Sequence, residues 1–488
     1  MKKRIILSLV TAAAMIVAFT VPQKKEKESA AEPRPNLLII LVDQYRAQAL
    51  GIEKKEQVFT PNLDELARNG YLSEQMVTNY PVCSPSRAML MSGVYPLRNK
   101  VYGNVNSKTE PYGVELPSDI SCWSDVLKAE GYYNGYIGKW HLDSPHKPYI
   151  PTYNNEGGLA WNEWAPPSRR HGFDYWYAYG TYDRHLHPMY WDTKAPRDSF
   201  HYVNEWGPQH EADKAIEFLG DAKKKNKPFS LVVSMNPPHS AYTEVPQRYV
   251  DMYKNVPLAD LIKDPDIPAE NTEWGQRYRK DVKYYYACIS GVDDQVGRIL
   301  HSLKEQKLDD NTLVMFIADH GNCLGKHDEE SKNNIYEESL RIPLIFYWKG
   351  HIHAQRDVST LTSMIDIYPT IMELLGLKSK IPAGLDGRSF AGNVMYNKGI
   401  KPETQYIMGA MTPPNLQSGF RGVRTSRYKL AYIDKKGDKK GYLFDLQNDP
   451  FELNNIYNDQ DTTVKRLEPI LKNWLTKTND PFSLKTVH

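Results

Sequence analysis

The chain has 488 residues, of which 41% are hydrophobic and 25% are charged, as in a globular protein with one large domain or a few ordinary ones. Its formal net charge is +2 with no basic stripe, which argues against nucleic acid as a partner. The four cysteines lie far apart without CxxC spacing, so neither a disulfide framework nor a zinc–thiolate site is assigned.

The N-terminus has the pattern of an export signal. Lys2-Lys3-Arg4 precedes an apolar run at 5–21, and polar residues follow. An uncleaved membrane anchor is the alternative, although a serine, a threonine and several alanines make the run weakly apolar. We expect a signal peptide at 1–22, a flexible leader at 23–34 and an exported protein, periplasmic or secreted. Losing the three signal charges takes the net charge from +2 to −1.

Apolar runs of strand length alternate with helical patterns over most of the chain. The alternation predicts an α/β fold, with a large mixed, mostly parallel sheet sandwiched by helices. The segment 144–199, rich in Pro, Trp, Tyr and His, is expected to form long functional loops. The expected strands are 36–42, 132–137, 229–234, 312–318 and 342–348, and the expected helices are 61–67, 124–130, 209–223 and 276–306, the last with a break near Gly291.

The pattern changes in the last quarter of the chain. Two runs at 428–433 and 442–445 flank a polar turn and predict an antiparallel hairpin, and 461–477 predicts a terminal helix. We therefore expect a smaller α+β subdomain after the main domain. The predicted domains are 35–376 and 377–488.

Polar side chains follow four of the predicted strands. Asp43, Lys139, His239 and Asp319 each lie at or just past a strand end. In parallel sheets ligands bind beyond the carboxyl ends of the strands. Taken singly each residue also fits a cap or a turn, but together they predict one site.

The segment Cys83-Ser84-Pro85-Ser86-Arg87 predicts a loop that enters a helix, because proline is favoured in a first helical turn. A cysteine at that position lies near free N–H groups, which favour a thiolate or a bound anion. Arg87 follows one turn later and is expected to fork onto an oxyanion. A buried structural cysteine is the alternative for Cys83.

Asp43, Gln44, Asp319 and His320 offer two carboxylates, an amide oxygen and an imidazole. Oxygen ligands suit a hard divalent cation, so Ca²⁺ is the first expectation and Mg²⁺ the second. Imidazole is a poor ligand for calcium, which makes His320 the less usual member.

The Cys83 segment, continued by Leu90 and Ser92-Gly93, resembles the signature of the type I sulfatases of the alkaline phosphatase superfamily. In that family the cysteine is oxidised to formylglycine. The resemblance covers about residues 35–457, and it departs at Gln44, where the family has a second acid. The further matching elements are Gly138-Lys139-Trp140-His141-Leu142, Pro238-His239, Gly325-x-His327 and Lys332.

This resemblance implies an alkaline-phosphatase-like fold and a formylglycine hydrate that attacks sulfur, supported by Arg87 and His141, and then re-forms the aldehyde. It also implies that Lys139 and Lys332 bind sulfate and that His239 lies near the leaving oxygen. Residue 83 joins the metal ligands. A formylglycine-generating enzyme or an anaerobic maturase is then a required partner. The implied metal ligands are Asp43, Gln44, Asp319, His320 and Cys83.

The expected substrate is a sulfated carbohydrate of an exported glycan, first a galactose or N-acetylgalactosamine sulfate cleaved by exo action. Arg184, His185 and His187, in the long loop region, are candidates for leaving-group recognition, with loop packing as the alternative. A phosphate or phosphonate ester hydrolase of the same superfamily is the nearest rival, and an inactive glycan-binding relative is the rival of another class. A thiol phosphatase fits less well, because its loop places five residues between Cys and Arg.

Overall fold

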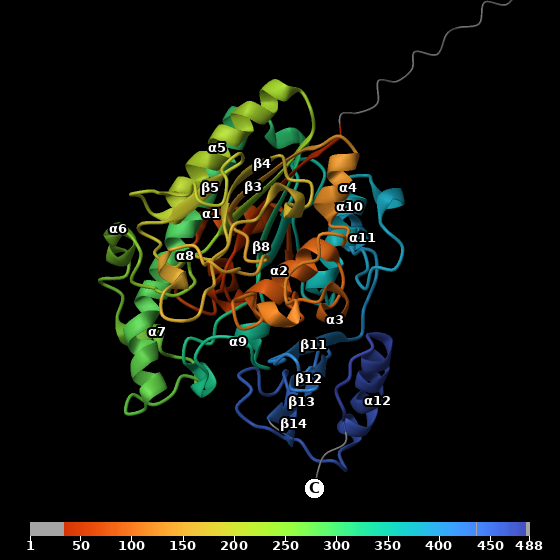
Figure 1. Cartoon of the computed structure of the whole chain (residues 1–488). Coiled ribbons are helices and arrows are strands. Elements are labelled where there is room, and N and C mark those ends of the chain that lie inside the picture. Colours follow the sequence, from red (N-terminus) through yellow and green to blue (C-terminus); the bar gives the residue numbers. More distant parts are fainter. Residues whose placement is uncertain (1–33, 436, 485–488) are drawn as a thin grey trace, which may run out of the picture. The chain divides into compact units, whose positions relative to one another are not determined.

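A ten-stranded sheet forms the centre of the chain (Figure 1). Its strand order is β10-β2-β9-β8-β1-β7-β3-β4-β5-β6. The computed structural model describes residues 34–435 and 437–484, so the predicted signal and leader lie outside the described residues, except Arg34. The strands are β1 (Asn36–Val42), β2 (Tyr71–Ser73), β3 (Tyr133–Lys139), β4 (Tyr175–Tyr179), β5 (Met189–Asp192), β6 (His201–Tyr202), β7 (Phe229–Met235), β8 (Thr312–Ala318), β9 (Leu344–Tyr347) and β10 (Gln355–Asp357).

Five neighbouring strands, β8, β1, β7, β3 and β4, run parallel, while β9, β5 and β6 join antiparallel. Every residue of β1 is buried, as expected of a central parallel strand. The register pairs Leu38 with Leu231 of β7 and with Val314 of β8. The carboxyl ends of these strands therefore meet at one edge, and the predicted mixed, mostly parallel sheet is confirmed.

Helices cover both faces of this sheet (Figure 1). One layer holds α1 (Pro61–Asn69), α5 (Gly207–Lys225) and α8 (Glu273–Glu305), and the other holds α2 (Cys83–Ser92), α4 (Trp123–Ala129) and α10 (Ile367–Leu374). None of the described helices is long and apolar enough to cross a membrane. The shorter helices are α3 (Pro96–Asn99), α6 (Gln247–Asp251), α7 (Leu258–Leu261), α9 (Glu337–Leu340) and α11 (Ala391–Tyr396).

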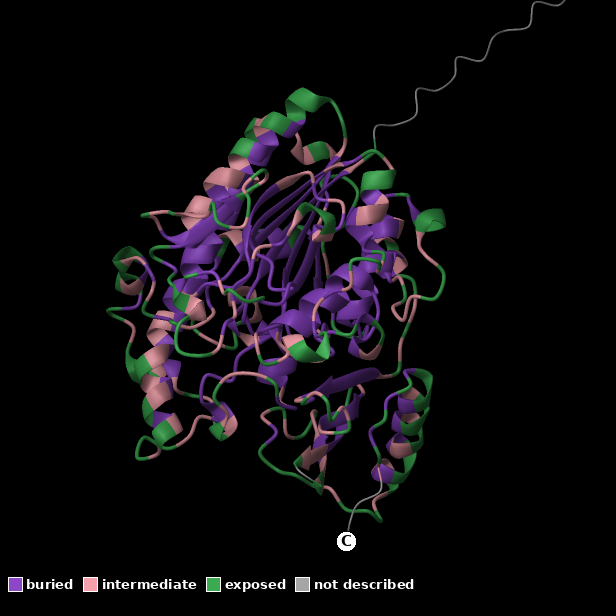
Figure 2. Ribbon diagram, in the orientation of Figure 1, coloured by how far each residue is buried: buried purple, intermediate pink, exposed green. Residues whose placement is uncertain are grey.

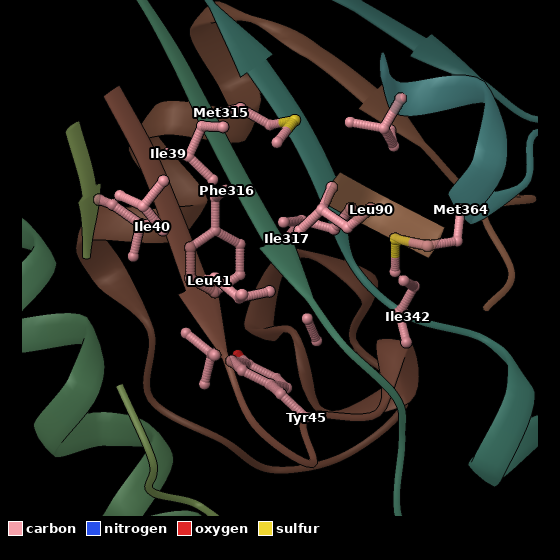
Figure 3. Packing of buried hydrophobic residues seen from close by; sticks show 14 of the residues in the cluster. Ile39, Ile40, Leu41, Tyr45, Leu90, Met315, Phe316, Ile317, Ile342 and Met364 are labelled. Atoms are coloured by element: carbon pink, nitrogen blue, oxygen red, sulfur yellow. The ribbon is translucent and has the colours of Figure 1, made fainter. Parts of the chain in front are cut away.

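Buried apolar side chains fill the space between the sheet and its helices (Figure 2). Ile39 and Leu41 of β1 line one small internal space together with Leu90 of α2. On the other face Tyr45 packs edge-on against Phe316 of β8, with ring centroids 5.8 Å apart. Figure 3 shows these β1 and β8 side chains at close range. This packing fixes the strand ends on which the polar residues stand.

The expectation of loops throughout 144–199 is wrong, because β4 and β5 lie within that segment. β4 pairs in parallel with β3, and Tyr177 lies opposite Ile137. Its sequence, Tyr-Trp-Tyr-Ala-Tyr, is aromatic on both faces and carries no alternation of apolar and polar residues. Strand periodicity therefore gave no signal there.

The predicted break near Gly291 is also wrong, because α8 continues through it. A Cβ at this position would lie 2.5 Å from Trp206 and 2.9 Å from Tyr249. Glycine therefore permits close packing of neighbouring side chains onto a continuous helix, at a small cost in helix propensity.

The last part of the chain forms a four-stranded antiparallel sheet and a helix, which confirms the predicted hairpin and terminal helix. The buried Glu337 carboxylate of α9 accepts hydrogen bonds from Arg424 Nη2 (2.8 Å) and Lys429 Nζ (3.0 Å) of this sheet. The boundary at residue 376 stays a prediction. The elements are β11 (Gln405–Gly409), β12 (Gly419–Arg424), β13 (Tyr428–Lys435), β14 (Asp438–Asp445) and α12 (Thr462–Lys477).

Candidate active site

Four polar residues from three strand ends converge on one cluster. Asp43 follows β1, Lys139 ends β3, and Asp319 and His320 follow β8. All four side chains are fully buried. The parallel register of β8, β1, β7 and β3 brings them together at the edge where ligands bind in such sheets.

Cys83 is the first residue of α2 and lies at the centre of the cluster. Its Sγ is 3.2 Å from Lys332 Nζ, 3.3 Å from His320 Nε2, 3.7 Å from Asp43 Oδ1 and 3.9 Å from Lys139 Nζ. Burial and Asp43 raise the pKa of the thiol, but Lys139, Lys332 and His320 together bring it well below its usual range. The site therefore favours negative charge at residue 83, as a helix start does.

Four side chains with metal-ligating atoms form a tight group. The ligand atoms of Asp43, Cys83, Asp319 and His320 lie within 4.8 Å of one another. Nδ1 of His320 lies 2.9 Å from the carbonyl oxygen of Gly321, which leaves Nε2 to face the carboxylates at 3.4 and 3.5 Å. Two carboxylates and an imidazole in this arrangement can bind a divalent cation.

Gln44 supports the same assignment. Its backbone has a φ of +67°, a conformation that non-glycine residues rarely adopt. Its side-chain Oε1 is buried and has no hydrogen-bond partner among the described residues. A buried amide oxygen without a partner is costly unless something else binds it. The residues present therefore fit a metal ion that takes oxygen ligands.

Arg87 occupies a different role from the oxyanion fork expected from its spacing. Its Nε donates to Asp319 Oδ2 (2.9 Å) and its Nη2 donates to Asp43 Oδ2 (3.1 Å). Its Nη1 donates to the Lys139 carbonyl oxygen (2.7 Å) and to Ser234 Oγ (2.8 Å). The guanidinium thus holds the two candidate metal-binding carboxylates in place, and Ser234 is a supporting residue that the sequence analysis missed.

Lys139 is fixed by two partners. Its Nζ lies 2.7 Å from Asp43 Oδ2 and donates to Asn236 Oδ1 at 3.0 Å. The sequence analysis missed Asn236, although it opens the segment after β7 that ends in Pro238-His239. Because Lys332 approaches residue 83 independently, two ammonium groups lie within 4 Å of that side chain.

His141 is buried beside this cluster. Its Nε2 lies 3.3 Å from the Val105 carbonyl oxygen, while Nδ1 is buried without a partner. Burial lowers the pKa of His141, and this outweighs the opposing interaction with Cys83, so the ring is favoured in its neutral form. A neutral ring with an unpartnered nitrogen can exchange a proton with a group placed at residue 83.

His239 stands at the exposed side of the cluster, with 16% of its side chain accessible. Its Nδ1 lies 3.3 Å from Asp183 Oδ1 and 2.7 Å from the Ser240 carbonyl oxygen. Burial and the two lysines lower the pKa of His239, whereas Asp183 and Asp43 raise it by more, so its pKa lies above the usual value. Within 34–435 and 437–484 no residue hydrogen-bonds to Nε2, which is therefore available to a ligand. The sequence analysis missed Asp183, although it named the next residue, Arg184, as a candidate for leaving-group recognition.

The three candidates for leaving-group recognition separate into two kinds. His185 is buried, and its Nε2 donates to the His239 carbonyl oxygen at 3.1 Å. It therefore helps to position the backbone of His239. Arg184 and His187 are exposed. The Arg184 guanidinium lies over the Tyr153 ring at 4.2 Å, and the His187 ring stacks on another aromatic ring.

Comparison with known proteins shows which family the chain belongs to. Residues 35–377 match the family model described as sulfatase. The chain belongs to the sulfatase family. Residues 325–480 also match the model described as N-sulphoglucosamine sulphohydrolase, C-terminal. The resemblance to sulfatases and the expected alkaline-phosphatase-like fold are confirmed, and this sulfatase is a sulfuric ester hydrolase.

Three similar proteins cover nearly the whole sulfatase. An endo-4-O-sulfatase of Bacteroides thetaiotaomicron is 37% identical, with 92% of this chain and 93% of the relative aligned. An ulvan-active sulfatase of Formosa agariphila is 30% identical over 96% of this chain and 87% of its own length. The crystal structure of a Bacteroides fragilis protein assigned as the sulfatase yidJ has a TM-score of 0.90 and 50% identity, covering 92% of this chain and 97% of that chain.

The Gln44 amide gives a prediction for metal binding. Gln44→Met keeps the side-chain length but removes the ligand oxygen, so the affinity of chelator-treated protein for Ca²⁺ should fall at least about tenfold. Gln44→Glu adds a charge and should tighten binding. Titration calorimetry with Ca²⁺ measures both, and Gln48→Met, which changes an amide four residues away, is the matched control. Equal affinities in Gln44→Met and Gln48→Met would show that Gln44 is not a ligand.

Proposed function

We propose that this sulfatase hydrolyses sulfate monoesters on carbohydrates through a formylglycine made from Cys83 and a divalent metal, Ca²⁺ first. The observation that carries the proposal is the group around residue 83: Lys139 and Lys332 within 4 Å of Sγ, beside two carboxylates and His320. A sulfate monoester carries one negative charge, which two ammonium groups and a cation can bind.

The chain's own residues support each part of the reaction. Lys139 and Lys332 bind the sulfate oxygens and stabilise the charge that develops on them. Arg87 holds Asp43 and Asp319, which with Gln44 and His320 would bind the metal. When bound, the metal supplies Lewis acidity at the sulfate. The Sγ stands where the oxygen atoms of formylglycine would be, and formylglycine supplies the attacking hydroxyl.

Two histidines are placed to transfer protons during the reaction. His141 Nδ1, buried and unpartnered, can accept a proton from residue 83. His239 protonates the departing alcohol through its free Nε2, and Asp183 orients it through Nδ1. A sugar alkoxide is a poor leaving group, so this proton matters most for carbohydrate esters.

The names of the relatives support a glycan substrate. One acts as an endo-4-O-sulfatase and one on ulvan. A 4-sulfated galactose or N-acetylgalactosamine unit is the first substrate that we propose. Exo action was the expectation from sequence and stays a prediction. Because one relative is an endo-4-O-sulfatase, activity on short and on long glycan chains is the first comparison to make.

Export and maturation complete the proposal. The basic and apolar segment at 1–22 supports secretion to the periplasm or beyond, where sulfated glycans are met. A formylglycine-generating enzyme or an anaerobic maturase must convert Cys83 before the enzyme acts. The proposals of export and of maturation are based on the sequence and on the resemblance to sulfatases.

Parallel assays separate this function from its rivals. We expect sulfate release from 4-nitrophenyl sulfate and from sulfated saccharides to exceed phosphate release from 4-nitrophenyl phosphate. Cys83→Ala should abolish sulfate release, and Lys332→Ala should lower it by about a hundredfold to a thousandfold without unfolding the chain. Lys304→Ala, which changes an exposed lysine at the end of α8, is the control.

Dominant phosphate turnover would favour the phosphate or phosphonate ester hydrolase. No turnover of any ester, with glycan binding retained, would favour the inactive glycan-binding relative. Full activity of Cys83→Ala or Lys332→Ala would overturn the roles given to these residues.

His239 has a separate signature. His239→Ala should lower kcat/KM about a hundredfold or more on a sulfated sugar, because the leaving alkoxide then lacks a proton donor. The loss should be much smaller on 4-nitrophenyl sulfate, whose leaving group needs little protonation. Steady-state kinetics on both substrates measure the contrast, and equal losses would assign His239 to sulfate binding instead.

A further inference from the structure

The exposed edge of the site carries a cation in a fixed position. Arg184 is exposed, and its Cζ lies 4.2 Å from the centre of the Tyr153 ring. Within 34–435 and 437–484 it forms no ion pair and no side-chain hydrogen bond. The stacking holds a side chain that would otherwise sample many rotamers, which lowers the entropy cost of using it to bind a ligand.

Hydrogen bonds tie the residues next to Tyr153 and Arg184 to the neighbourhood of His239. Asn154, next to Tyr153, donates from Nδ2 to Asp183 Oδ2 at 2.7 Å, and Asp183 N donates back to Asn154 Oδ1 at 3.1 Å. Asp183 in turn orients His239. Tyr153 and Arg184 are thus each adjacent in sequence to a residue of the Asn154–Asp183 pair.

The same side is where the site opens. Cys83 is 1% exposed, whereas the side chains of His239 and Asp183 are 16% and 28% exposed. We therefore expect a leaving group protonated by His239 to lie on this exposed side, beside Asp183 and the exposed residue that follows it, Arg184. His187, stacked on Tyr202 with the rings 5.4 Å apart, adds a second exposed polar group in this region.

We propose that Arg184 binds a second anionic group of the glycan, a carboxylate or another sulfate, on the leaving-group side of the scissile ester. The preferred substrate class is then a polyanionic glycan rather than one with a single charge. A guanidinium binds carboxylate and sulfate through paired N–H donors, whose planar geometry fits either group. Tyr153 positions Arg184 and does not itself contact the reacting atoms.

The test rests on the proposed function and measures selectivity. The probes are a 4-sulfated N-acetylgalactosamine oligosaccharide with a neighbouring uronate, the same compound with the carboxylate reduced to an alcohol, and a disulfated galactan oligosaccharide without uronate. Wild-type kcat/KM should be higher for the uronate or the disulfated compound than for the reduced one, and added salt should narrow the difference. The two charged compounds distinguish carboxylate from sulfate.

Arg184→Ala should lower that selectivity about tenfold, the value of one charge-assisted hydrogen bond. Tyr153→Leu leaves Arg184 in place but removes the ring on which its guanidinium stacks. This variant should lower selectivity less, and mainly through KM. Arg466→Ala is the matched control, because Arg466 is an exposed arginine on α12 that lies over Tyr428 at 5.9 Å.

Unchanged selectivity in Arg184→Ala, or a wild type that does not distinguish the charged compounds from the reduced one, would overturn the inference while the sulfatase function stands. No sulfate release from any compound by wild-type protein would instead overturn the proposed function. Melting temperatures of all variants separate a packing defect from a change of recognition.

Discussion

The site depends on one guanidinium placed between two carboxylates. Arg87 donates to Asp43 from β1 and to Asp319 from β8, at 3.1 and 2.9 Å. Two buried carboxylates this close would repel each other and take up a proton without a cation between them. Arg87 orients both carboxylates. It also opposes the rise in the pKa of Asp319 that burial and Asp43 cause, while Lys139 and other cations hold the pKa of Asp43 well below its usual range. The helix that begins at Cys83 brings Arg87 there one turn later. The ligand geometry and the position of residue 83 therefore come from the same helix.

Around this pair the charges are arranged to receive an anion. Lys139 and Lys332 approach residue 83 from separate elements, and each is held by further contacts. Gln44 stands where the resemblance to sulfatases leads one to expect a second acid, so the cluster is one negative charge poorer. A less negative ligand set binds a metal more weakly and leaves more net positive charge for the sulfate. The substitution thus shifts the balance toward anion binding.

Much of the fold and site follows from sequence patterns. The strand ends at Asp43, Lys139, His239 and Asp319 were predicted because apolar runs stop abruptly there, and the structure brings all four together. The strands β4 and β5 were missed because their aromatic residues show no period. The use of Arg87, the burial of His185 and the partnership of Asp183 with His239 depend on tertiary contacts, which spacing along the chain does not encode.

The central claim is that residue 83 acts as formylglycine and not as a thiol. Mass spectrometry of the peptide that carries residue 83, from protein produced together with a maturase, tests this most directly when paired with sulfate release from the same preparation. The account predicts an aldehyde at residue 83, detected by reaction with a hydrazide, and activity that rises in proportion to the converted fraction. Full sulfate release from a preparation in which Cys83 is entirely unmodified would contradict it.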